Sequence, residues 1–227
     1  MMYFFKNRYS IHILIFLVTL FIFNIGFKYS GSGDTIPNEL LPISIIYEKD
    51  LDFNEFFTDD LGLPYWYGYV RGKIVASYSI MPGLLNLPVY SIAHILGVDL
   101  FEKRFLLSML SSSIIASLSA VFMYLCLLRI CGRQSTAVFF TLLYAFGTCV
   151  WSVVARGIWQ HGPSLLLITL SIFLLLSKKN EFVPYVGFLL GLAVFNRPAN
   201  ILIALSIACY VFFYRRDQFK KYTILVS

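Results

Sequence analysis

A glycine-rich turn directly after the first apolar run carries a carboxylate that could act as a base or as a metal ligand. The segment from Gly31 to Pro42 holds Asp34 between glycine, serine and threonine residues. A carboxylate fixed in this way can take a proton from a hydroxyl group or bind a metal ion. The same segment also resembles a capped helix start, in which Asp34 would only accept backbone hydrogen bonds. Glu39 follows one to two helical turns later and could share the site.

A second segment, between Tyr65 and Tyr78, alternates aromatic residues with small ones and contains Arg71 and Lys73. The alternation and the glycines predict a short β-hairpin. Aromatic rings beside basic side chains suit sugar stacking, or anchoring at lipid headgroups. The acidic run before it, from Glu48 to Asp60, lacks the spacing of a calcium-binding loop and is predicted to be a solvated face.

The third and fourth segments are short polar turns between apolar runs. One places Arg156, Trp159 and His161 within a few residues of one another. His161 could cap or anchor a helix, or bind a metal together with Asp34, or donate to a phosphate. The other contains Arg197, whose guanidinium suits bidentate phosphate recognition, although it could also extend to the lipid headgroups.

The composition indicates whether the chain is surrounded by water or by membrane lipid. Hydrophobic residues make up 59% of the 227 residues, charged residues only 13%, and the mean hydropathy is +0.76. Soluble domains carry about 25% charged residues. We therefore exclude a soluble globular protein, a disordered chain and a nucleic-acid-binding module. Membrane lipids are the expected surroundings. Four cysteines without a CxxC spacing predict neither a disulfide framework nor a zinc site.

A bilayer core needs about 20 mostly apolar residues per helix. On this basis the chain is predicted to be an all-α polytopic membrane protein with about six transmembrane helices. A large external loop, residues 28–104, contains juxtamembrane helices, one of them at about 82–97. The predicted spans cover residues 11–27, 105–130, 135–154, 161–177, 182–196 and 198–214.

The basic residues set the expected orientation. If the proline-interrupted stretch 80–96 lies in the membrane interface, ten lysines and arginines fall on one side, which is then cytoplasmic. If that stretch spans, two of their clusters move outside. The interfacial interpretation predicts a plasma (inner) membrane protein with cytoplasmic N- and C-termini. Asp34, Arg156, His161 and Arg197 then share the external face, and ionisable groups that gather at one membrane face indicate a functional site.

The order and spacing of these segments resemble the GT-C superfamily of polyprenyl-phosphate-sugar-dependent glycosyltransferases, such as aminoarabinose lipid A transferases and protein O-mannosyltransferases. The matching residues are Gly33-Asp34-Thr35 after the first span, the Met81–Gly97 juxtamembrane helix, Glu102-Lys-Arg104, Ala155-Arg156 and Gly191–Pro198. The chain departs from the family where His161 stands in place of an aspartate and where a Lys-Pro-Pro element is reduced to Pro82.

The resemblance implies transfer of a sugar from a polyprenyl-phosphate donor to an acceptor on the outer face, with inversion at the sugar carbon. Asp34 would act as the base, or orient the acceptor hydroxyl through a divalent metal held by Asp34 and His161. Arg197 would bind the donor phosphate, and Arg156, Trp159 and His161 would line its headgroup. Glu39 and the hairpin cations Arg71 and Lys73 would contribute to substrate binding. The acceptor, a lipid, a glycan or a protein, is not specified.

Two other functions remain open from the sequence. The chain could be a non-catalytic or truncated membrane subunit, because an apolar run begins at its end and family members are longer. It could also transport or flip a lipid-linked substrate. A transporter would need polar residues at mid-membrane, and the predicted spans carry almost no charge at their centres.

Overall fold

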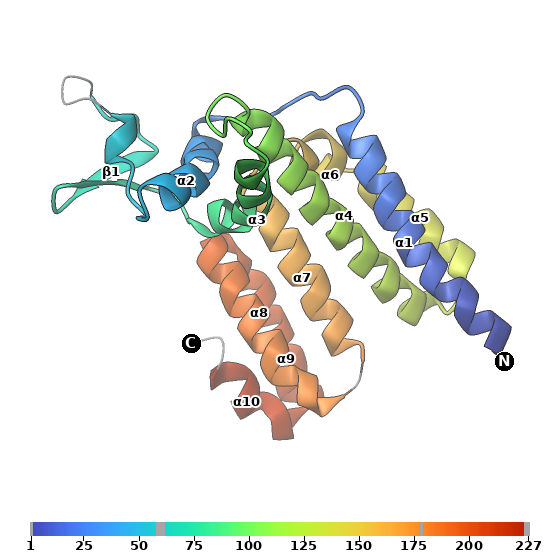
Figure 1. The fold of residues 1–227 in the computed structure, drawn as a ribbon. Coiled ribbons are helices and arrows are strands. Elements are labelled where there is room, and N and C mark those ends of the chain that lie inside the picture. Colours follow the sequence, from blue (N-terminus) through green and yellow to red (C-terminus); the bar gives the residue numbers. More distant parts are fainter. Residues whose placement is uncertain (1, 58–61, 178, 225–227) are drawn as a thin grey trace.

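The computed structural model describes residues 2–57, 62–177 and 179–224, and within them the chain is mostly helical, as predicted. Long helices lie side by side and smaller elements cover one end of them (Figure 1). The helices of the bundle are α1 (Met2–Asn24), α4 (Arg104–Cys131), α5 (Gln134–Phe146), α7 (His161–Leu175), α8 (Val183–Asn196) and α9 (Ile201–Tyr214). The remaining α-helices of the described chain are α2 (Ile36–Tyr47), α3 (Met81–Ile95), α6 (Cys149–Ser152) and α10 (Phe219–Ile224).

Helix α4 is the centre of the bundle and packs against α1, α5 and α7. It has 28 residues, a mean hydropathy of 2.2 over its most apolar part, and a length of about 42 Å. The helix ends at Cys131, and the next residue, Gly132, adopts a left-handed conformation with a φ of 68°. This helix is therefore long and apolar enough to cross a bilayer.

The other long helices meet the length requirement only in part. Helices α5 and α6, with the turn that follows to Arg156, form one apolar pair bent by 41° at Gly147 and Thr148. The pair is long and apolar enough to cross a bilayer only if its two helices are counted as one span. Shorter apolar helices cover Ile11–Asn24, His161–Leu175 and Pro198–Tyr214. One or two helices in the described chain thus qualify by length and composition, against the six predicted spans.

The helix ends also differ from the predicted ones. Helix α1 stops at Asn24 rather than at residue 27, because Gly26 and Phe27 have positive φ angles of 79° and 41°. Helix α5 stops at Phe146, eight residues before the predicted end of that span. The predicted juxtamembrane helix at 82–97 is α3, which begins at Met81 with Pro82 in its first turn.

Many small and polar side chains are buried inside the helix bundle, and large apolar ones are exposed on its surface. On α4 the buried residues include six serines, at positions 108, 111, 112, 113, 117 and 119. Outside, Phe21 of α1 is 70% exposed and Phe213 of α9 is 75% exposed. Large apolar faces of this kind are unusual on a soluble monomer and typical of helices that contact lipid or another protein.

The segment between α1 and α4 forms a small subdomain at one end of the bundle (Figure 1). It contains α2, α3 and the predicted hairpin, whose strands β1 (Tyr67–Val70) and β2 (Lys73–Ala76) pair antiparallel. Asn38 joins α2 to α3, since its side-chain oxygen accepts from the Gly83 amide at 2.9 Å and its carbonyl accepts from Asn86 at 2.9 Å. A Cβ on Gly83 would lie 2.8 Å from Leu41, so the two helices approach closely only because residue 83 is glycine.

Candidate functional site

Asp34 lies in a single 3₁₀ turn, Gly33–Thr35, that leads directly into α2. Ser32 caps this turn, so Asp34 is not the capping residue and its carboxylate is left to face outward. The carboxylate accepts from the Tyr65 hydroxyl at 3.5 Å, and it also interacts with the Tyr78 hydroxyl. Asp34 is partly exposed. A carboxylate in this setting is accessible to a substrate hydroxyl and can act as a base.

The chain just before Asp34 is fastened to the turn that contains Arg156 and Trp159. The amide of Ser30 donates to the carbonyl of Arg156 at 2.8 Å, and the Trp159 indole donates to the carbonyl of Ser30 at 2.8 Å. Gly157 allows this approach, because a Cβ there would lie 2.4 Å from the Ser30 oxygen. Two predicted site segments that are far apart in sequence are therefore joined in the fold.

His161 and Arg197 form a second joined pair at the same end of the bundle. His161 is the first residue of α7, and Arg197 directly follows α8. The Nη1 atom of Arg197 lies 2.9 Å from Nδ1 of His161. Because arginine only donates hydrogen bonds, Nδ1 must accept, and the proton of the neutral imidazole is then on Nε2.

A buried amide network holds this pair in place. Asn196 donates to the Gln160 carbonyl at 2.7 Å and to the Ser164 hydroxyl at 2.8 Å. Asn200 donates to the same hydroxyl at 2.8 Å and to the Ala193 carbonyl at 2.7 Å. Ser164 and the two asparagines are buried. The network fixes the start of α7 against the turn between α8 and α9, and with it the spacing of His161 and Arg197.

A pocket of about 380 Å³ opens beside the pair. Its polar lining comes from His161, Ser164, Arg197 and Asn200. Its apolar lining comes from Val153, Val154, Leu165, Ile168 and Ile203, with Cys149 at one side. An anionic headgroup attached to an apolar chain matches this division between a cationic end and an apolar remainder.

Arg156 itself does not line this pocket. Its Nε atom donates to the Trp151 carbonyl at 3.2 Å, and its guanidinium lies over the Trp151 ring at 5.8 Å from the centroid. Its backbone carbonyl is what holds Ser30. Arg156 therefore shapes the turn, while Trp159 locks the neighbouring segment to it.

Glu39 is fully buried rather than presented beside Asp34. One carboxylate oxygen accepts a short hydrogen bond from the Tyr29 hydroxyl, which also contacts the Thr35 hydroxyl at 2.9 Å. The other oxygen has no hydrogen-bond partner among the described residues. Burial raises the pKa of Glu39 above its ordinary value, although Tyr29, Thr35 and Arg104 act in the opposite direction. In this structure Glu39 anchors α2 internally and is closed to a substrate.

Neither of the two predicted hairpin cations lines the pocket beside His161 and Arg197. Arg71 is exposed in the hairpin turn, with a φ of 50°. Lys73 forms a 2.5 Å ion pair with Asp52, which is buried. The hydrogen bond from Lys73 lowers the pKa of Asp52 and raises that of Lys73. Lys73 therefore fastens the hairpin to the preceding acidic segment.

The acidic run from Glu48 to Asp60 was predicted to be a solvated face, yet Asp52 within it is buried. Asp59 and Asp60 lie outside the described residues. Asp50, Asp52 and Glu55 bring oxygen atoms within 4.8 Å of one another. Within residues 2–57, 62–177 and 179–224 this is the one group of three or more potential metal ligands. Neither Asp34 nor His161 belongs to it, and Nδ1 of His161 is occupied by Arg197. Metal binding by Asp34 and His161 stays a prediction, and no step below depends on a metal.

The sequence analysis did not identify Ser164 and Asn200. Each lies three residues after a predicted site residue, His161 or Arg197, in an otherwise apolar stretch. Polar residues at helical spacing inside apolar runs are the signal that could have found them, because such residues need partners in a bilayer. The cysteines at 126, 131, 149 and 209 form no disulfide in the described chain.

Comparison of the chain with protein-family models, with curated proteins and with solved structures found no match. A function for the chain therefore has to be argued from its own residues.

Proposed function

We propose that the chain is a multi-pass membrane glycosyltransferase of the GT-C type, which transfers a sugar from a polyprenyl-phosphate donor at the outer membrane face. The observation that carries the proposal is the pocket beside His161 and Arg197. It combines a cationic end with an apolar remainder. A lipid-linked phosphate has the same two parts, and the guanidinium can bind two phosphate oxygens.

The membrane part of the proposal is supported by the surface of the helices. Large apolar side chains are exposed along α1 and α9, while the interior of α4 is lined by small and polar residues. Helices α7, α8 and α9 have 15, 14 and 14 residues, or about 21–23 Å each. They would cross a bilayer core of about 30 Å with the help of their flanking residues and local thinning of the membrane.

The chemical part rests on Asp34. The carboxylate would accept the proton of an acceptor hydroxyl as the hydroxyl oxygen attacks the anomeric carbon of the donor sugar. The bond from that carbon to the phosphate oxygen breaks, and the lipid phosphate leaves with the bonding electrons. Arg197 would stabilise the charge that grows on the leaving phosphate. Trp159, by holding Ser30, keeps the Asp34 turn at the same end of the bundle as Arg197.

Separate measurements of donor binding and of sugar transfer distinguish the role of Arg197 from that of Asp34. The purified chain in lipid nanodiscs is titrated with polyprenyl-phosphate sugars, and sugar transfer is followed with a radiolabelled donor and candidate acceptors. We expect Arg197→Ala to weaken donor binding at least tenfold, since hydrogen bonds to charged groups contribute about 1.5–3 kcal/mol. Asp34→Asn should retain donor binding and abolish transfer. Arg133→Ala, an exposed arginine at the opposite end of α4, is the matched control.

Two results would contradict the proposal. One is the absence of saturable donor binding in a chain shown to be folded, which would favour a non-catalytic subunit. The other is unchanged transfer in Asp34→Asn. Net movement of the lipid-linked donor between leaflets, without transfer, would instead favour a flippase.

A further inference from the structure

The external segment contains a second pocket that the proposed transfer reaction does not use. It lies between α2, the hairpin and the turn before α4, has a volume of about 490 Å³, and will be called the aromatic pocket. Its lining includes Phe56, Phe57, Trp66, Tyr67, Phe101 and Arg104. A pocket of this size with aromatic walls and few polar groups is typical of a small-molecule site.

One polar group in the wall of the aromatic pocket lacks a partner. Tyr67 is only 6% exposed, and its hydroxyl makes no hydrogen bond to any described residue. A buried hydroxyl left unpaired costs about 1–3 kcal/mol, so such groups usually have a partner. Burial and the nearby carboxylates of Glu39 and Glu55 raise the pKa of Tyr67. The phenol therefore keeps its proton. Its oxygen is fully buried, so a ligand group accepts a hydrogen bond from it once the side chains around the ring shift.

Arg104 supplies further donors at the same pocket. Its guanidinium lies between the rings of Phe101 and Phe105, at 4.5 Å and 4.3 Å from their centroids. One nitrogen, Nη1, donates to the Phe101 carbonyl at 2.8 Å. Since a guanidinium has five N–H donors and the described residues accept only this bond from it, donors remain for a ligand.

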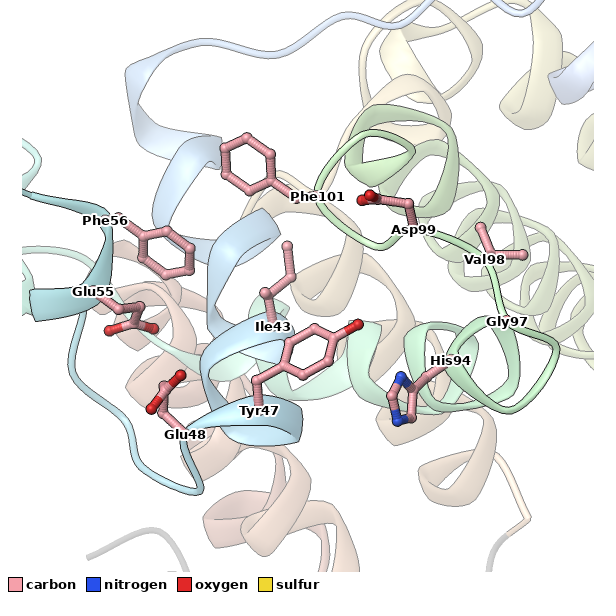
Figure 2. A pocket seen from close by; sticks show the side chains of 10 residues that line it. All are labelled: Ile43, Tyr47, Glu48, Glu55, Phe56, His94, Gly97, Val98, Asp99 and Phe101. Carbon is pink, nitrogen blue, oxygen red and sulfur yellow. The ribbon is translucent and has the colours of Figure 1, made fainter.

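A larger, acidic pocket of about 660 Å³ adjoins the aromatic pocket, and Figure 2 shows the residues that line it. Glu55, Phe56 and Phe101 line both pockets. The rings of Phe56 and Phe101 are stacked, with centroids 6.3 Å apart, and mark the boundary. Glu48, Glu55 and Asp99 are exposed and line the acidic pocket, where Figure 2 labels them. Their charge disfavours an anionic ligand and favours a neutral or cationic one.

We propose that the aromatic pocket binds a sugar residue of a neutral or amine-bearing glycan, which extends into the acidic pocket. The apolar face of a sugar ring can stack on an aromatic side chain, and its hydroxyl groups can accept from Tyr67 and Arg104 and donate to Glu55. An apolar lipid chain would leave these groups unpaired, and a phosphorylated ligand would face three carboxylates. The two pockets share part of their lining, so together they suit a ligand of more than one sugar.

The pocket also lies next to the Asp34 turn. Gly33 packs so closely on the Trp66 ring that a Cβ there would be 2.3 Å from it. A glycan in the aromatic pocket would thus be held beside the segment that carries Asp34. If the transferase proposal holds, this glycan is the acceptor. The binding proposal does not require it, because the pocket and its free hydroxyl are independent of Arg197.

The test is binding of oligosaccharides to the full chain in lipid nanodiscs, measured by saturation-transfer NMR and calorimetry without any polyprenyl-phosphate donor. The probes are neutral gluco- and manno-oligosaccharides, N-acetylglucosamine oligomers, glucosamine oligomers and, as the charge control, oligomers of glucuronate. We expect saturable binding of a neutral or amine-bearing probe and no binding of the glucuronate probe. Because the donor is absent, failure here leaves the transferase proposal untouched, and failure of transfer leaves this result standing.

Variants locate the bound sugar. Tyr67→Phe removes a hydroxyl that has no partner in the protein, so the chain should stay folded while affinity falls about three- to tenfold. Tyr69→Phe makes the same change two residues away, at a ring that is 70% exposed, and should have no effect. Trp66→Ala should abolish binding. No saturable binding to the folded chain, equal affinity in Tyr67→Phe and wild type, or equal binding of glucuronate oligomers would overturn the proposal.

Discussion

The guanidinium of Arg197 and the imidazole of His161 lie 2.9 Å apart, and the direction of their hydrogen bond fixes the state of the histidine. Nδ1 accepts, so the ring is neutral with its proton on Nε2. His161 thereby orients Arg197 without competing with it for an anion. A second cation at this position would repel the guanidinium, and a carboxylate would neutralise it.

This relationship predicts how His161 variants behave. His161→Ala removes the acceptor that orients Arg197, so donor binding should weaken about three- to tenfold, the value of one ordinary hydrogen bond. His161→Asn retains an acceptor oxygen on a short side chain and should recover part of the loss. The measurement is titration with a polyprenyl-phosphate sugar. Equal binding by all three proteins would show that His161 has no role in orienting Arg197.

The shared hydroxyl of Ser164 predicts a stability effect. Ser164→Ala leaves one N–H of Asn196 and one of Asn200 unpaired in a buried site. Each unpaired donor costs about 1–3 kcal/mol. We expect a clear fall in the thermal unfolding temperature in nanodiscs. Ser206→Ala is the control, because Ser206 is exposed and bonds only within its own helix. Equal unfolding temperatures of the two variants would contradict the network as described.

The buried carboxyl of Glu39 predicts a pH dependence. Its pKa is raised in the folded chain, so the folded state holds the proton more tightly than the unfolded state. Stability is then greatest below the ordinary carboxyl pKa and falls as pH rises through the folded pKa, by about 1.4 kcal/mol for each tenfold difference in proton affinity. Glu39→Gln keeps an acceptor for Tyr29 and should flatten this fall.

Unfolding of wild type and Glu39→Gln is followed between mildly acidic and neutral pH. Glu181→Gln, a change at an exposed carboxylate, should behave like wild type. Asp52, whose pKa is lowered, contributes stability that is lost as pH falls below its usual range, and both variants retain it. A Glu39→Gln profile parallel to that of wild type would contradict the prediction.

Two native cysteines test the proposed membrane orientation. Cys131 is exposed at the end of α4, beside the basic residues that predict the cytoplasmic side, and Cys149 is exposed at the start of α6. In intact cells, a membrane-impermeant maleimide should label a variant that retains only Cys149 and not one that retains only Cys131. After permeabilisation both should react. Labelling of Cys131 alone in intact cells would reverse the orientation.

Local signals in the sequence predicted those parts of the fold that depend on neighbouring residues. The hairpin at 67–76 follows from aromatic alternation around Gly72, and α3 follows from an apolar run that begins at Met81 with a proline in its first turn. Hydropathy did not predict the break of the third apolar run at Gly147, because the average over a window is unchanged by one bend.

The candidate site was predicted less well, because it depends on partners that are remote in sequence. Asp34 and Arg197 were predicted from their residue types and from their places in short polar turns beside apolar runs, and the segments that carry them lie at one end of the bundle. Glu39 was expected beside Asp34, yet Tyr29 draws it into the interior. Lys73 was expected to bind substrate, yet it is paired with Asp52. In both cases a side chain that was predicted to bind a ligand instead contacts another residue of the protein.

The bond from Trp159 to Ser30 joins positions 129 residues apart, and this has a consequence for how the chain matures. During synthesis the Asp34 turn emerges long before the indole that secures it. Contacts of such separation form slowly, since a long loop must close first. The segment that carries Asp34 therefore lacks this hydrogen bond until more than half of the chain has been made. A chaperone or a neighbouring membrane protein that shields this segment would act in that interval.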